Sequence, residues 1–253
     1  MIIKSERTPF HIRLAGVVIR IEPIYDYMEE YCRDYITNEP AEFTVRTEYA
    51  DIAFEREKSV KEAEKSGSPV MEFSDAYLET LAVYRKISET LPLFNVILFH
   101  GSVIAVDGMG YLFTAKSGTG KSTHTRLWRE QFGNRAVMVN DDKPLLKITD
   151  DGVSACGTPW NGKHRLSTNI SAPLKAVCVL TRDKVNHIEE IEPREAYQML
   201  LQQIYRPIDK AAMAQTLKLI DGMMKHTRFY RLGCNMELEA AKVAFEGMNG
   251  ELK

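Results

Sequence analysis

The residues best suited to chemistry lie in one glycine-rich octapeptide, Ala115-Lys-Ser-Gly-Thr-Gly-Lys-Ser122. Gly118 and Gly120 allow the backbone to curl, so that successive N–H groups can point at phosphate oxygens. Lys121 supplies a mobile positive charge for phosphates, and the Ser122 hydroxyl can ligate Mg²⁺. The octapeptide therefore predicts a phosphate-binding loop that has alanine where the usual motif begins with glycine.

The segments on either side of the loop agree with this interpretation. Residues 111–114 form a short apolar run that is typical of a strand, and residues 122–132 can form a helix. A helix that begins near Lys121 presents unpaired N–H groups and a positive dipole end to the same anion. The alternative is a glycine-rich turn without a ligand. The predicted nucleotide contacts are Ala115, Lys116, Ser117, Gly118, Thr119, Gly120, Lys121, Ser122 and Thr123.

Two further groups of polar residues flank the loop in the sequence. Asp141 and Asp142 follow the short apolar run 136–139, and His100-Gly101 precedes the loop. A carboxylate within hydrogen-bond reach of a hydroxyl can accept its proton. The acids have a second interpretation as the start of a turn before Pro144. His100 is equally well explained as a core histidine on an apolar strand.

The elements that must position these residues predict an α/β fold with a mixed sheet. Asp107-Gly108 lies between two apolar segments, 96–106 and 109–114, and this is a strong hairpin signal. The strand before the phosphate loop is then one arm of an antiparallel hairpin, whereas such strands are ordinarily parallel to their neighbours. We therefore expect a phosphate-loop core with an antiparallel hairpin before the loop.

The N-terminal third of the chain predicts an α+β extension that packs onto the nucleotide-binding part. Residues 10–22 are rich in β-branched side chains and predict a strand bent at Gly16, and a helix with apolar residues at helical spacing begins at Ser74. Pro92 ends that helix. We assign residues 1–92 to the extension and residues 93–253 to a nucleotide-binding domain, and nothing in the extension suggests chemistry.

Composition excludes several classes of function. The net charge of −2 argues against a nucleic-acid binder, because affinity for a phosphate backbone comes from excess Lys and Arg. The four cysteines include no Cys-x-x-Cys pair, so a zinc or redox motif is not expected. We find neither a signal peptide nor an apolar run long enough to cross a membrane. We therefore expect a cytoplasmic protein with no membrane partner.

These motifs together resemble the catalytic domain of HPr kinase/phosphorylase and, more distantly, ATP-dependent phosphoenolpyruvate carboxykinase. The shared features are His100-Gly101 before the hairpin, the Ser-Gly-x-Gly-Lys-Ser loop at 117–122, and the Asp141-Asp142 pair at the end of the next strand. Their order and the hairpin also match. The resemblance covers about residues 95–232, thins after residue 157, and leaves the N-terminal part without a match.

The resemblance implies an ATP- and Mg²⁺-dependent kinase whose acceptor is a hydroxyl, on a protein serine or a small molecule. By analogy Asp142 is the base, and Asp141 with Ser122 supports the metal, although the sequence alone cannot order the two acids. The resemblance places His100 near the transferring phosphate. Arg206 would match the family's later catalytic arginine.

One segment departs from the family pattern. Where the HPr enzymes carry a glutamate of the metal site, residues 157–165 contain no acid, which puts the second metal contact and a phosphorylase activity in doubt. The same segment contains Lys163 and Arg165, which either bind an anionic substrate or belong to a solvated basic loop. The HPr enzymes assemble as hexamers, which leaves a homo-oligomer open, although no copy of their assembly tail is recognisable here.

Two alternatives to the kinase stay open. A non-catalytic ATP-binding sensor or assembly protein is favoured by Ala115 and by the missing glutamate, whereas intact Lys121 and Ser122 favour the kinase. A phosphoenolpyruvate carboxykinase-like enzyme ranks below both, because this chain lacks room for the substrate domain of those longer enzymes. The sequence does not identify the acceptor.

Overall fold

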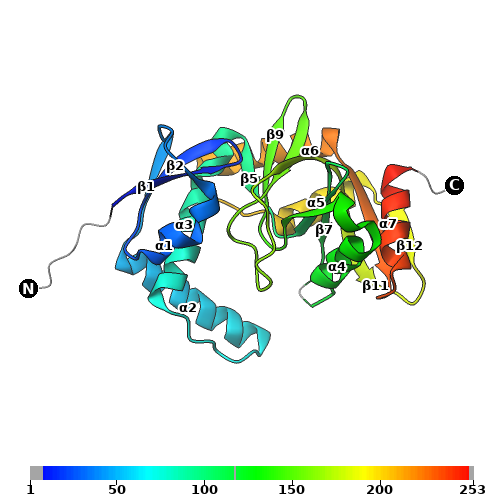
Figure 1. Cartoon of the computed structure of the whole chain (residues 1–253), viewed down its shortest axis with the longest axis horizontal. Coiled ribbons are helices and arrows are strands. Elements are labelled where there is room, and N and C mark those ends of the chain that lie inside the picture. Colours follow the sequence, from blue (N-terminus) through cyan, green and yellow to red (C-terminus); the bar gives the residue numbers. More distant parts are fainter. Residues whose placement is uncertain (1–7, 117, 251–253) are drawn as a thin grey trace, which may run out of the picture. The chain divides into compact units, whose positions relative to one another are not determined.

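The computed structural model describes residues 8–116 and 118–250 (Figure 1). Its backbone contacts divide the chain into two compact units, Met1–Thr90 and Leu91–Lys253. The phosphate loop and every predicted site residue belong to the second unit.

The first unit has a four-stranded sheet in the order β3-β1-β2-β4. Its elements are β1 (Phe10–Leu14), β2 (Val17–Glu22), α1 (Tyr27–Tyr31), β3 (Ile36–Thr37), β4 (Phe43–Arg46), α2 (Tyr49–Ser66) and α3 (Asp75–Thr90). The strand expected over residues 10–22 is instead a hairpin, because Ala15 and Gly16 both have positive φ and reverse the chain. Buried Glu79 of α3 accepts hydrogen bonds from the backbone N–H groups of Ile24 and Tyr25, at 2.6 and 2.9 Å, and so fixes the segment after β2.

The second unit is built on a nine-stranded sheet that is joined through one long strand, β11. Along the main path the order is β5-β9-β10-β11-β7-β6-β8, and β13 pairs with β11 and β12. The strands are β5 (Val96–Leu98), β6 (Ser102–Val106), β7 (Met109–Thr114), β8 (Ala136–Asn140), β9 (Leu145–Thr149), β10 (Gly152–Cys156), β11 (Ser171–Arg182), β12 (His187–Glu190) and β13 (Arg228–Cys234).

The predicted mixed sheet is confirmed. Strand β7, which leads into the phosphate loop, pairs antiparallel with β6 and parallel with β11. Asp107 and Gly108 have φ values of 52° and 82° and form the hairpin turn between β6 and β7. The apolar segment 96–106 is not one strand, however, because the chain leaves the sheet at His100-Gly101 and β5 pairs with β9 instead.

Helices cover both faces of this sheet. On one face, α4 (Lys121–Phe132) and α7 (Glu239–Asn249) lie side by side and pack Trp128 and Ala244 into one apolar cluster (Figure 1). On the other face, α5 (Pro193–Gln203) and α6 (Lys210–His226) contribute Leu200 and Ile220 to a second cluster. No helix within the described ranges is both long and apolar enough to cross a membrane.

A buried histidine in α4 makes this packing sensitive to pH. His124 is 2% exposed, and its Nε2 accepts a hydrogen bond of 3.0 Å from Trp128 Nε1. Its Nδ1 is buried and has no partner among the described residues. Burial lowers the pKa of His124 from its ordinary value of 6.5 to about 3. The folded protein therefore holds this imidazole neutral at pH values where the unfolded chain takes up a proton.

We expect the free energy of unfolding to fall as the pH drops below about 6.5, because the unfolded state then binds the extra proton. Between about pH 7.5 and about pH 5.5, His124 alone should remove about 1.4 kcal/mol. Urea unfolding at both pH values measures the loss. His124→Gln keeps an acceptor for Trp128 and should flatten this part of the profile, whereas exposed His226→Gln should not. An equal slope in wild type and His124→Gln would contradict the assignment.

Candidate active site

The predicted phosphate loop is described on either side of Ser117, which itself lies outside the described residues. Gly118 and Gly120 have φ values of 77° and 125°, a region that side chains other than glycine rarely adopt. Helix α4 begins at Lys121, and its first intrahelical bond runs from His124 N–H to Gly120 C=O, at 2.9 Å. The N–H groups of residues 120–123 therefore have no acceptor within the described chain and are available to an anion.

The His100-Gly101 pair is held where β6 begins, close to the acids. Gly101 N–H donates to Asp142 C=O at 3.0 Å, and His100 N–H donates to Gln203 C=O at 2.8 Å. A Cβ on Gly101 would lie 2.8 Å from the carbonyl oxygen of Phe113, so only glycine fits without a backbone shift. Close packing, and not an unusual φ, explains this glycine.

A buried asparagine shapes the turn that carries the two acids. The Oδ1 atom of Asn140 accepts from the backbone N–H groups of Asp142 and Lys143, at 2.9 and 2.7 Å. Its Nδ2 donates to Thr158 Oγ1 at 2.9 Å and to the Trp160 carbonyl at 3.3 Å. Asn140 thus fixes the backbone of the acid pair and also ties it to the segment 157–165.

Asn140 ends β8 one residue out of register. Strand β8 pairs antiparallel with β6, but Ile104 pairs with Met138 whereas Val103 pairs with Asn140. Val139 is therefore the extra residue of a β-bulge, a feature that re-aims the side chains that follow it.

Asp141 is the more buried of the two acids, at 5% exposed. Burial raises the pKa of its carboxyl group, while the neighbouring hydroxyls of Ser102 and Ser122 and the nearby His164 act in the opposite direction. Its Oδ1 atom is buried without a hydrogen-bond partner in the described chain. A buried carboxylate oxygen beside the loop serine is suited to a cation.

Asp142 is half-buried and lies beside the predicted histidine. Its Oδ1 is 3.5 Å from His100 Nε2, and its Oδ2 is 3.7 Å from Lys143 Nζ. Burial acts to raise the pKa of Asp142, but the hydrogen bond from His100 and the charges of Lys143, His100 and Lys121 outweigh it, so the pKa is lowered. Asp142 is therefore kept as a carboxylate, and the pKa values of the two acids are moved in opposite directions.

Lys121 joins the loop to the acids. Burial lowers the pKa of its ammonium group, and the negative charges of Asp142 and Asp141 act to raise it. The lysine side chain is thus within electrostatic range of both carboxylates. The structure brings together Lys121, Ser122, the acid pair and His100.

The segment 157–165 folds against the acids through residues other than those expected. A Cβ on Gly162 would lie 3.0 Å from Asp142 Cβ, and the charge of His164 acts on Asp141. Lys163 and Arg165 are both exposed. Because the basic segment lies over the acids, these two side chains can border a substrate, but the structure gives neither a contact to the site.

Arg206 lies in the segment that follows α5. The segment after α5 pairs antiparallel with the chain around Phe99, where Phe99 bridges Ile204 and Tyr205 N–H donates to Leu98 C=O at 3.0 Å. Because the two segments are antiparallel, the Gln203 backbone lies next to His100, and Arg206 follows Tyr205 on the side of Leu98 that faces away from His100. The Arg206 side chain is exposed.

Three residues near the site are not singled out by the sequence: Ser102, Asn140 and Arg182. Ser102 follows the His-Gly pair, and its hydroxyl donates to the Asp141 carbonyl at 2.8 Å. Arg182 ends β11 and reaches two carbonyl oxygens of the phosphate loop. Proximity to the motifs points to the first two in retrospect, but only strand order brings Arg182 to the loop.

The site fits a magnesium ion that is shared with phosphates. Nowhere in the described ranges do three or more His, Cys, Asp or Glu side chains gather as a metal cage. Mg²⁺ is usually held by one or two protein ligands together with substrate phosphates and water. The unpartnered Asp141 Oδ1 and the neighbouring Ser122 hydroxyl meet that requirement. When bound, such an ion would neutralise phosphate charge.

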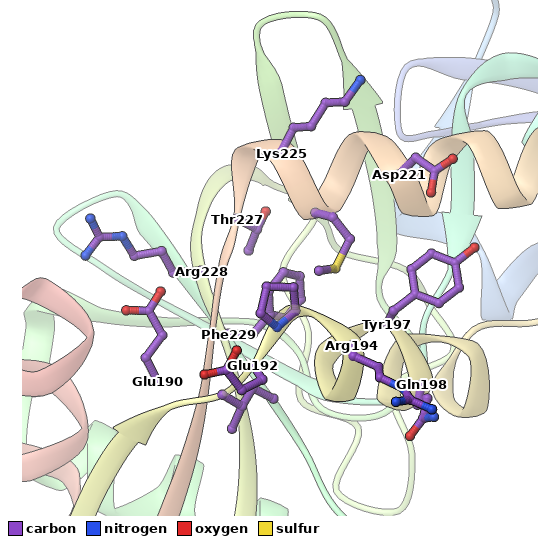
Figure 2. Close-up of a pocket in the computed structure, with 13 residues that line it drawn as sticks. Glu190, Glu192, Arg194, Tyr197, Gln198, Asp221, Lys225, Thr227, Arg228 and Phe229 are labelled. Atoms are coloured by element: carbon purple, nitrogen blue, oxygen red, sulfur yellow. The ribbon is translucent and has the colours of Figure 1, made fainter.

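A separate cavity of about 1070 Å³ lies away from the predicted residues (Figure 2). It is formed where β12 meets α5 and where α6 meets β13, and its lining mixes the acids Glu192 and Asp221 with the bases Arg194 and Lys225. The phosphate loop follows the carboxyl end of β7, whereas this cavity adjoins the start of β13, which is parallel to β11 and β7 at the opposite end of the sheet. The size of this cavity is therefore no evidence for or against nucleotide binding at the phosphate loop.

Asn140→Ala should destabilise the protein by about 2–4 kcal/mol, because buried backbone groups lose their hydrogen-bond partners. Urea unfolding measures the effect. Asn134→Ala, an exposed asparagine before β8, should change the free energy of unfolding by less than about 0.5 kcal/mol. If both variants unfold at the same urea concentration, Asn140 does not hold the acid turn.

Comparisons with known proteins add little to this geometry. No family model matches the chain, and no curated protein matches it. One similar solved structure is the HPr(Ser) kinase/phosphatase from Coxiella burnetii, with 12% sequence identity and a TM-score of 0.36, covering 60% of this chain and 97% of that chain. At this level of similarity the comparison decides neither the fold nor the activity, and both depend on the chain's own residues.

Proposed function

We propose that the unit after residue 92 is an ATP- and Mg²⁺-dependent kinase that transfers the γ-phosphoryl group to a hydroxyl of a protein serine or a small molecule. The observation that supports it most is the electrostatic coupling of one lysine to two acids. Helix α4 begins at Lys121, after a loop with unpaired amide donors. The negative charges of Asp141 and Asp142 both act to raise the pKa of the Lys121 ammonium group. Loop, lysine and paired acids are the parts that phosphoryl transfer requires.

The two acids take different roles in this proposal. Asp142 is half-buried, ionised and beside His100, so it serves as the base toward the acceptor. Asp141 is buried beside Ser122, and these two residues would hold the metal. Lys121 and the amides of the loop would bind the phosphates, and His100, whose Nε2 is 3.5 Å from Asp142 Oδ1, would lie near the transferred group.

The reaction is a single displacement at phosphorus. The acceptor oxygen forms a bond to the γ-phosphorus while the bond from that phosphorus to the β,γ-bridging oxygen breaks, and ADP leaves. The hydroxyl proton moves to the Asp142 carboxylate, which can release it to solvent because the side chain is half-exposed. Most of the rate enhancement would come from positioning and charge neutralisation.

Incubation with Mg²⁺ and ATP labelled at the γ-phosphate tests the proposal. We expect the label to move to a hydroxyl compound or a serine-containing protein in a panel of acceptors, with ADP formed in equal amount. Omission of Mg²⁺ should stop the transfer. If ADP never forms while ATP binds, the kinase proposal fails.

A non-catalytic ATP-binding sensor is the second candidate, and one observation favours it. No third acid joins Asp141 and Asp142 in the described part of the site, so a second metal would lack a carboxylate ligand. The sensor would bind ATP with Lys121 and the loop amides and release it unchanged. Binding without ADP formation is the result that separates this candidate from the kinase.

A further inference from the structure

Arg182, the last residue of β11, reaches the phosphate loop from outside. Its Nη2 donates to the Gly118 carbonyl oxygen at 2.5 Å and its Nε donates to the Thr119 carbonyl oxygen at 3.3 Å. The neighbouring carbonyls have other partners, since Lys116 C=O accepts from Thr119 N–H and Gly120 C=O accepts from the helix. Arg182 thus donates hydrogen bonds to the two carbonyl oxygens at the tip of the loop that receive none from the turn or the helix.

These contacts decide which way the amide donors point. In a trans peptide, the C=O of one residue and the N–H of the next point in opposite directions. Because the Thr119 carbonyl is held toward Arg182, the Gly120 N–H is directed away from it, and that N–H has no acceptor among the residues described. The two glycines allow many backbone conformations, so an external contact is needed to select one.

The sheet, and not the loop, positions this arginine. Strand β11 runs parallel to β7 with Val179 opposite Thr114, and so both strands end at the same edge of the sheet. Arg182 lies three residues beyond Val179, level with the loop that follows Thr114. Its side chain is exposed, so it contributes little to the core. The N-terminus of α4 has no side-chain cap of its own.

We propose that Arg182 is a positioning residue that holds the phosphate loop in its binding conformation before the nucleotide arrives. This inference rests on the proposed function for the identity of the anion, a nucleoside di- or triphosphate. A loop that is already ordered loses less conformational entropy on binding. The arginine should therefore increase affinity for any nucleotide that places phosphates in the loop, with or without a γ-phosphate.

The test compares Arg182→Gln and Arg182→Lys with a matched control, Arg194→Gln, which alters an exposed arginine at the distant cavity. In the ligand-free protein, hydrogen exchange of the Thr119 and His124 amides, which donate to Lys116 C=O and Gly120 C=O, should be about tenfold faster in Arg182→Gln and unchanged in the control. Arg182→Lys should fall between, because one ammonium cannot reproduce the two directed donors. Thermal unfolding shows whether each variant is folded.

Nucleotide binding gives the second measurement. Arg182→Gln should raise the Kd for ATP and for ADP by the same factor, about tenfold, with kcat at saturating ATP changed much less. A loss confined to ATP would overturn the proposal, because it would show a direct contact with the γ-phosphate. Unchanged exchange and unchanged Kd would overturn it too. If wild type binds neither nucleotide, the proposed function fails, while the exchange measurement still tests Arg182.

Discussion

Asp142→Asn should reduce phosphoryl transfer by about 10²–10⁴-fold, because the amide that replaces the carboxylate cannot accept the hydroxyl proton. The folded site keeps Asp142 ionised next to His100 and Lys121, so the wild-type residue is ready to act as a base near neutral pH. Binding of ATP should be retained or slightly tightened, since the substitution removes one negative charge near the polyphosphate. Initial rates at saturating ATP and a separate measurement of the Kd for ATP resolve the two effects.

The control for this variant is Asp150→Asn, an exposed acid in the turn between β9 and β10. It should leave both the rate and the Kd unchanged. A rate for Asp142→Asn within about threefold of wild type would exclude Asp142 as the base. The same measurement on Asp141→Asn separates the roles, because loss of a metal-side acid should be partly reversed by raising the Mg²⁺ concentration.

Lys121→Ala should weaken ATP binding by about 100-fold and reduce transfer further, because one residue supplies the loop's charge-assisted hydrogen bonds to the phosphates. Hydrogen bonds to charged groups contribute about 1.5–3 kcal/mol each, so loss of one or two is enough for this effect. The variant should still fold, since Lys121 is only half-buried and its removal leaves the apolar clusters intact. Calorimetric titration with ATP and a labelled-phosphate assay measure the two losses.

Lys218→Ala, an exposed lysine of α6, is the matched control and should bind ATP like wild type. The Asp142→Asn and Lys121→Ala variants should also differ from each other. Asp142→Asn should lose transfer but keep binding, whereas Lys121→Ala should lose both. Wild-type affinity in Lys121→Ala would contradict the phosphate-loop assignment, and with it both the kinase and the sensor.

Elements with strong local signals could be predicted from the sequence. Helix α4 begins at Lys121, and Asp209 caps α6 by accepting a hydrogen bond of 2.8 Å from Ala212 N–H. The Asp107-Gly108 turn predicts the antiparallel hairpin of β6 and β7 before the loop, and therefore the mixed sheet. Each of these features depends on residues that are close neighbours in the chain, so the cause lies within the segment itself.

Features that depend on pairing between distant segments could not be predicted. Strand β5 pairs with β9, about 50 residues away, although its apolar sequence continues toward β6 without a recognisable break. Strand β12 carries no sequence signal, because three of its four side chains are exposed and nothing in it alternates. The sequence predicts only a bend at Gly16 where the chain reverses at Ala15 and Gly16, because alanine at positive φ gives no sequence signal.

The candidate site shows the same division. The loop, the acids and His100 could be found because each is a short motif, whereas the contact from Arg182 and the placement of Arg206 follow from strand order and direction. The network of Asn140 also joins residues 18 and 20 positions apart. Roles that depend on geometry between segments required the structure.

The extra residue in β8 has a consequence for how this chain can change in length. Because Val139 is the extra residue, its removal would leave Asn140 opposite Val103 but would straighten the end of β8, and the acids that follow would lose the direction that the bulge gives them. Changes of one residue in the surface turn Gly133–Arg135 lie outside the strand. Natural variants of this chain should therefore vary in length before Ala136 and keep the length of β8 from Ala136 to Asn140.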